Sequence, residues 1–176
     1  MNEFTKQALA ICGNSSVELE EVLQVFDDGV GFCKLSAEDS NYQFLIHGEL
    51  HDFVKHGYKP HDKLTAKLAF FYTEGGRIYK DEDEFLSEEN HRLAPETFIP
   101  ITEYDEEDEM RHDDSSAFVC GKVLDYANIQ LDGVPMVHVR LACLCCTLDL
   151  FLDANVFPSC ENGNIIRGVF DVIGSI

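Results

Sequence analysis

Long apolar runs are missing from this sequence. No apolar segment approaches the ~18 residues that a helix needs to cross a bilayer, so no membrane partner is expected. Residues 1–14 include Glu3 and lack a sustained apolar stretch, which makes them a poor secretory signal. We predict that they form a short helix or tail, and that the protein is cytoplasmic.

The usual signatures of catalysis are missing as well. The sequence has no glycine-rich phosphate loop, no nucleophile elbow and no H-E-x-x-H zinc motif. Its seven cysteines are an odd number without the paired spacing of a zinc site. These absences argue against an enzyme, and no cofactor is predicted.

Basic residues are few. The chain has 13 Lys and Arg against 33 Asp and Glu, for a net charge of −20. Residues 81–114 alone hold 15 acidic and 2 basic residues. Such a block repels itself and favours a solvated path, so it is predicted to be an acidic linker. A segment that shields a basic site or mimics a polyanion is the alternative.

The rest of the chain is rich enough in apolar residues to form a core, and it alternates with a period of two. Hydrophobic residues make up 45% of the sequence. Leu148, Leu150 and Leu152 would share one face of a strand. Asp28-Gly29 and Asp132-Gly133 are typical of tight hairpin turns. The pattern predicts a mainly β fold, α+β at most.

Two β modules are predicted, at residues 15–80 and 115–176, on either side of the acidic segment. Similar patterns of small, polar and apolar residues occur in His61–Phe71 and Gly163–Ile173. This similarity favours an internal duplication, with two small barrels in tandem.

The C-terminal module resembles the oligonucleotide/oligosaccharide-binding (OB) barrel. The resemblance depends on AFVCGKVLDY (Ala117–Tyr126) as a first strand and NGNIIRGVFDVIG (Asn162–Gly174) as a return strand. It implies a five-stranded barrel that serves as a binding scaffold. The sequence ends before a clear fifth strand, so the other half of the chain or a second subunit would complete the sheet. An open sheet edge would favour a homodimer.

Three cysteines lie within four positions, at Cys143, Cys145 and Cys146. On a strand the first two would share a face, unlike the turn-borne C-x-x-C pairs of zinc sites. Free cysteine packs as a small buried hydrophobe. Core packing is therefore preferred over metal binding or redox chemistry, and no metal site is predicted here.

Histidines gather between His47 and His61, and His47 and His51 are four residues apart. On a helix such a pair could bind a metal ion and support a metal-dependent hydrolase. The preceding run is strand-like and Gly48 follows His47, so surface residues in a loop are the preferred interpretation.

One segment opposes the global charge. Residues 53–80 carry six basic and two acidic residues, with tyrosines and phenylalanines between them. Basic residues beside stacking rings suit single-stranded nucleic acid or an acidic partner. The candidate site residues are Lys55, Tyr58, Lys59, Lys63, Lys67, Tyr72, Arg77 and Tyr79. Residues 81–114 could fold back over this segment and compete with an anionic ligand.

The sequence as a whole predicts a non-enzymatic binding protein. A net charge of −20 favours a basic protein partner and disfavours polyanions. Single-stranded nucleic-acid binding through residues 53–80 is the first alternative, and the metal-dependent hydrolase is the second.

Overall fold

The fold is mainly β, as predicted. The computed structural model describes residues 1–39, 42–89, 92–105, 110–144 and 146–176. Nine strands of this part of the chain form one sheet: β1 (Asn14–Val25), β2 (Gly31–Asp39), β3 (Tyr42–His51), β4 (Lys63–Tyr79), β5 (Thr97–Asp105), β6 (Met110–Leu131), β7 (Val134–Cys143), β8 (Cys146–Asp153) and β9 (Ile165–Ser175). The helices are α1 (Glu3–Ile11), α2 (Phe53–His56) and α3 (Glu82–Glu88). None of the described helices is long and apolar enough to span a bilayer.

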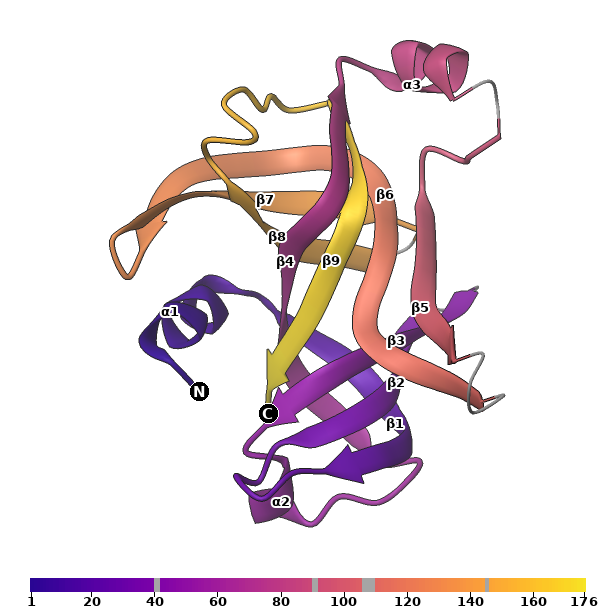
Figure 1. Ribbon diagram of the computed structural model, residues 1–176, viewed down its shortest axis with the longest axis vertical. Helices are drawn as coiled ribbons and strands as arrows, with labels where there is room; N and C mark the ends of the chain where they lie inside the picture. The colour runs from indigo at the N-terminus through magenta and orange to yellow at the C-terminus, as the bar shows by residue number, and fades with distance from the viewer. Residues whose placement is uncertain (40–41, 90–91, 106–109, 145) are drawn as a thin grey trace.

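The sheet closes on itself twice, and the two closed circuits share strands β4 and β9 (Figure 1). The first circuit runs β1–β2–β3–β9–β4, and β4 pairs back with β1. The second runs β6–β7–β8–β4–β9, and β9 pairs back with β6. Closing each ring removes edges that would otherwise be free to pair with other chains.

The two circuits have the same connectivity. In each, one neighbouring pair is parallel, β3–β9 in the first and β4–β8 in the second, and all other pairs are antiparallel. β4 follows β1–β3 in the chain and completes the first circuit, and it also supplies the fifth strand of the second circuit. In the same way, β9 follows β6–β8 and completes the second circuit, and it supplies the fifth strand of the first. The fifth strand that the C-terminal sequence lacks is therefore supplied by β4. The segments matched as a duplication, His61–Phe71 and Gly163–Ile173, contain the first part of β4 and most of β9.

Both predicted hairpin turns are confirmed. Asp132 and Gly133 have φ values of 48° and 79° and join β6 to β7. Two consecutive positive φ values match the right-handed twist of a two-residue hairpin. Gly29, with φ of 84°, lies in the turn between β1 and β2.

The interiors of the circuits form one apolar core. Leu148, Leu150 and Leu152 are all buried in it, as their alternation predicts. Phe151 points to the outer face but is buried too, because α1 packs over it with Ala8 and Leu9. Residues 1–14 therefore contain a helix that covers part of the second circuit.

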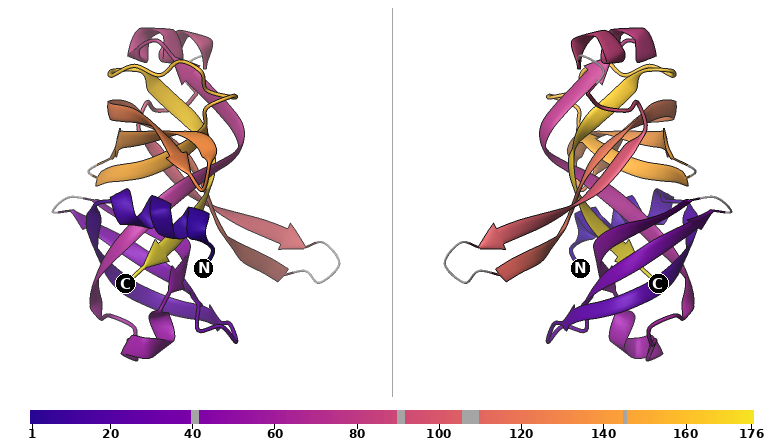
Figure 2. Two further views of the ribbon diagram at one scale, coloured as in Figure 1. Left: turned by 90° about the vertical axis from the view of Figure 1, so that its left-hand side faces the viewer. Right: turned by 90° about the vertical axis from the view of Figure 1, so that its right-hand side faces the viewer.

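The segment 81–114, where a linker is predicted, contains α3, β5 and the first part of β6. β5 pairs with β6 from Thr97↔Cys120 to Asp105↔Met110. Figure 2 shows β5 and the adjoining part of β6 projecting from the rest of the protein as a two-stranded ribbon. We refer to residues 101–105 and 110–115, which lie beyond the part of β6 that pairs with β9, as the β5–β6 arm.

Candidate functional site

The predicted basic and aromatic site does not form one surface. β4 is 17 residues long, and at ~3.3 Å per residue it extends on the order of 50 Å. The candidate residues are distributed along the strand and the segment that precedes it. One group lies before the strand or in its first five residues, and the other lies in its middle and at its end: Lys55, Tyr58, Lys59, Lys63 and Lys67, then Tyr72, Arg77 and Tyr79.

Two of the three candidate tyrosines are packed within the protein. Tyr79 is 1% exposed, and its ring meets Phe85 edge to face at 5.1 Å. Tyr72 packs edge to face against Phe157 at 4.8 Å. Stacking on a nucleobase needs an open ring face, so Tyr79 cannot provide the predicted platform, and the half-buried Tyr72 ring is already in contact with Phe157.

Helix α3 lies over the far end of β4. Arg77 forms an ion pair with Glu88. Glu89 accepts a hydrogen bond from the Tyr79 hydroxyl, and its Oε1 lies 2.9 Å from Arg167 Nε. The hydrogen bond from Tyr79 and the charge of Arg167 lower the pKa of Glu89, whereas desolvation raises the pKa of Tyr79. Part of the acidic segment thus contacts the basic strand, and its competition with an anionic ligand remains a prediction.

Replacing Glu89 by glutamine should lower the free energy of unfolding by about 1.5–3 kcal/mol at neutral pH, the range for hydrogen bonds to charged groups. The folded-state pKa of Glu89 is lowered, so its stabilisation is present at neutral pH and is lost as the pH falls below the ordinary value of 4.5. The difference between the wild type and Glu89→Gln should therefore shrink in acid. Urea unfolding at several pH values measures it, and the exposed Glu82→Gln on the same helix is the control.

The lysines near the start of β4 are held by local contacts. Lys67 donates from Nζ to the carbonyl oxygen of Ala10 at 3.4 Å, and Lys55 pairs with Asp52. Tyr58 is half-buried, and its ring stacks on His56 at 5.4 Å. This end has charge but only one of the predicted rings.

The surface-loop prediction is wrong for His47. Strand β3 continues through Gly48 to His51, paired with β2, and His47 is only 5% exposed. His51 is half-buried, and desolvation lowers its pKa. The two residues lie on a strand, so the helical spacing behind the hydrolase alternative does not occur. Among described residues, three ligand atoms that could hold a metal ion gather elsewhere, on Glu18, Glu20 and His61, all within 4.8 Å of one another.

Cys143 packs in the core as predicted, but the predicted strand through Cys143 and Cys146 is wrong, because β7 ends at Cys143 and β8 begins at Cys146, which pairs with Cys143 across the hairpin. Cys143 is fully buried, and burial raises the pKa of its thiol to about 12. Desolvation likewise raises the pKa of Cys12, Cys33 and Cys120 to about 12. Such thiols are protonated at neutral pH and are poor nucleophiles or metal ligands. Cys146 is half-buried, and Cys145 lies outside the described residues.

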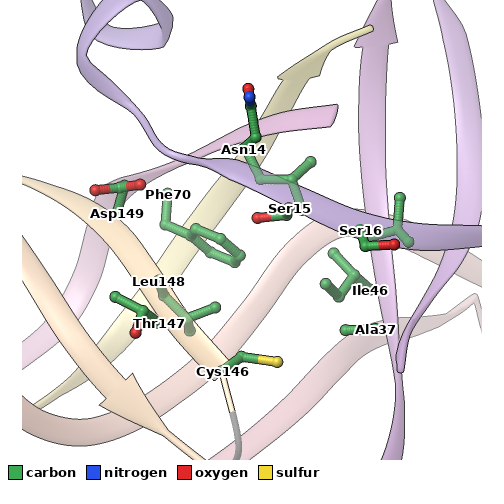
Figure 3. Close-up of a pocket in the computed structure, with 12 residues that line it drawn as sticks. Asn14, Ser15, Ser16, Ala37, Ile46, Phe70, Cys146, Thr147, Leu148 and Asp149 are labelled. Carbon is green, nitrogen blue, oxygen red and sulfur yellow. The ribbon is translucent and has the colours of Figure 1, made fainter. Parts of the chain in front are cut away.

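A pocket of about 240 Å³ lies where the two circuits meet. Figure 3 shows polar side chains from the start of β1 on one side of the pocket and polar side chains from β8 on the other, with apolar side chains between them. Its labelled lining residues are Asn14, Ser15, Ser16, Ala37, Ile46, Phe70, Cys146, Thr147, Leu148 and Asp149. In the sequence, Ser15 and Ser16 have the appearance of linker or cap residues, and only the pairing of β1 with β4 brings them to this place.

Asp149 fixes one side of this junction pocket. Its Oδ1 lies 2.8 Å from His138 Nε2, and its Oδ2 accepts a hydrogen bond from the Gly13 backbone at 2.9 Å. The carboxylate is 9% exposed, so both contacts are largely shielded from water. They hold the chain between α1 and β1 against the second circuit.

Comparison with known proteins gives no relative. No family model, curated protein or solved structure matches this chain. Its function is therefore inferred from its own residues and their arrangement.

Proposed function

We propose that this chain is a non-enzymatic, cytoplasmic binding protein that binds a basic protein partner through its acidic surface. The observation that carries the proposal is the β5–β6 arm, which projects away from both circuits (Figure 2). Residues 103–114 of the sequence include eight acidic residues and one basic residue. Concentrated negative charge on a projecting element accelerates encounter with a positive surface.

The scaffold is proposed to be a pair of OB-like barrels. Each circuit has five strands whose first three are consecutive in the chain. In the first circuit α2 lies between the third and fourth strands, and residues 154–164 occupy the same place in the second. Both features agree with the OB barrel, which is a binding fold.

Two further observations support parts of this proposal. Five buried cysteines of the described residues have free thiols, as expected in a reducing compartment: Cys12, Cys33, Cys120, Cys143 and Cys160. The Tyr79 ring is packed inside the protein and the half-buried Tyr72 ring packs against Phe157, which weakens the case for single-stranded nucleic acid. A basic protein is therefore the preferred partner.

Neutralising the arm should weaken binding to a basic peptide. In Glu103→Gln/Asp105→Asn, we expect affinity for a fluorescent lysine-rich peptide to fall about fivefold to tenfold at low salt, since each charge contributes a fraction of a kcal/mol to about 1 kcal/mol. Fluorescence anisotropy at several salt concentrations measures the affinity. The expected difference narrows as salt rises.

The matched control is Glu82→Gln/Asp83→Asn, which removes the same charge from the exposed first turn of α3. An equal loss in both variants would show that only net charge matters and would refute a binding role for the arm. Absence of binding by the wild type would refute the basic partner altogether.

A further inference from the structure

A second cavity, of about 310 Å³, lies on the outer face of the second circuit, beside the N-terminal part of α1. It combines apolar walls with two carboxylates. The lining residues used below are Phe4, Phe71, Met136, Phe151, Asp153 and Asp171. They come from α1 and four different strands.

Strand register places three of these side chains in one row. Phe71 pairs with Asp171 of β9 on one side and with Phe151 of β8 on the other. Phe71 and Phe151 stack with ring centroids 5.2 Å apart and planes inclined by 28°. The row therefore places the Asp171 carboxylate beside the half-buried Phe71 ring, and the fully buried Phe151 ring supports Phe71 from its other side.

Helix α1 adds a third ring. The Phe4 ring lies 5.6 Å from the Phe71 ring and is inclined by 39° to it. Because the rings are inclined, they form a corner and not a flat slot. A corner suits a compact, rounded group better than a planar guanidinium, which stacks parallel to a ring.

The carboxylates give the cavity its charge. Asp171 is half-buried, and within the described part of the chain neither Asp171 nor Asp153 has an ion-pair partner. Burial raises the pKa of Asp171, and the negative charges of Asp114 and Glu49 raise it further. A cation near Asp171 would relieve this repulsion.

We propose that this cavity binds an alkylammonium group, namely the head of a lysine side chain, methylated or not, on the basic partner. Aromatic ring faces attract such cations through their quadrupoles, most strongly where water is excluded. The Asp171 carboxylate supplies the opposite charge from the same row. The identity of the carrier rests on the proposed function, whereas alkylammonium binding by the cavity does not.

Tetramethylammonium chloride is a suitable probe, and its neutral isostere tert-butanol is the matched control. In nitrogen-15 spectra of the full chain, tetramethylammonium should cause saturable shifts at the amides of Phe4, Phe71, Phe151 and Asp171. Tert-butanol or sodium chloride at the same concentration should not. Equal shifts with tert-butanol, or shifts spread over the acidic surface, would overturn the site.

Two substitutions test separately the contributions of the carboxylate charge and of the aromatic ring to tetramethylammonium binding. Asp171→Asn and Phe71→Leu should each weaken tetramethylammonium binding at least fivefold. Their controls are Asp125→Asn and Phe26→Leu, which make the same changes at exposed positions outside the cavity. If Phe71→Leu lowers stability, Phe4→Leu at the cavity rim replaces it. Unchanged binding in Asp171→Asn would refute the proposal.

A lysine-rich peptide then tests the carrier. Displacement of tetramethylammonium by the peptide supports a lysine side chain in the cavity. Binding of tetramethylammonium without any peptide binding would overturn the lysine carrier and the basic partner, and would leave a site for a free alkylammonium compound. Peptide binding through the arm without any shift in the cavity would overturn this inference and leave the proposed function intact.

Discussion

Replacing Phe170 by alanine should lower the free energy of unfolding by about 3–5 kcal/mol, the range for removing a large aromatic side chain from a core. Phe170 is fully buried in β9, and its ring lies edge to face with Tyr72 at 6.0 Å. Because β9 belongs to both circuits, we expect the whole protein to unfold in one transition at a lower urea concentration.

Hydrogen exchange at increasing urea concentrations checks this expectation. Amides of β2, in the first circuit, and of β7, in the second, should lose protection together in Phe170→Ala. Val169→Ala is the neighbouring control, since Val169 is only half-buried and its loss should cost less than about 1.5 kcal/mol. Protection retained by β2 after β7 has opened would contradict the coupling of the circuits.

The Asp149→Ala variant should lose about 1–3 kcal/mol of stability, because two partly buried hydrogen bonds lose their acceptor. Asp149 contacts the His138 ring and the Gly13 backbone, so its removal leaves both without this acceptor. We further expect the segment that joins α1 to β1 to open locally, ahead of global unfolding.

Faster hydrogen exchange in residues 3–13 measures this local opening. The control is Asp125→Ala, because the exposed Asp125 carboxylate bonds only its neighbouring Tyr126 amide. Equal exchange in α1 of the wild type and of Asp149→Ala would show that this carboxylate does not hold the helix.

Local features of the fold could be predicted from the sequence. The alternation of Leu148, Leu150 and Leu152, and the Asp-Gly turns, are short-range signals that depend on neighbouring residues only. Gly121 lies where β6 passes very close to β7, because a Cβ there would overlap the carbonyl oxygen of Ala142.

Long-range features could not be predicted in this way. The exchange of β4 and β9 depends on which edges meet, and no local pattern encodes that choice. In residues 81–114 the excess of acidic residues predicts a linker, whereas the structure has strand β5 there. The buried Phe98 and the 51% exposed Ile99 show the alternation of a strand. The sequence predicts a surface loop at His47 because Gly48 has the appearance of a strand end, whereas β3 continues through Gly48 to His51.

The candidate sites were missed for the same reason. The alkylammonium cavity collects residues from α1, β4, β7, β8 and β9, which lie up to 169 positions apart. Phe71 and Asp171 are separate in the sequence and become neighbours only through strand register. Only the acidic character of the surface could be predicted directly from the sequence, because it depends on composition alone.

The passage of β4 and β9 through both rings leaves no hinge between the halves of the molecule. The halves cannot swing apart to admit a partner or close around it, as proteins with two independently moving lobes do. Under the proposed function, the basic partner therefore meets a preformed surface, and little ordering entropy is lost in the body of the protein on association. Its association rate should then be set by diffusion and electrostatic steering, without a slow opening step.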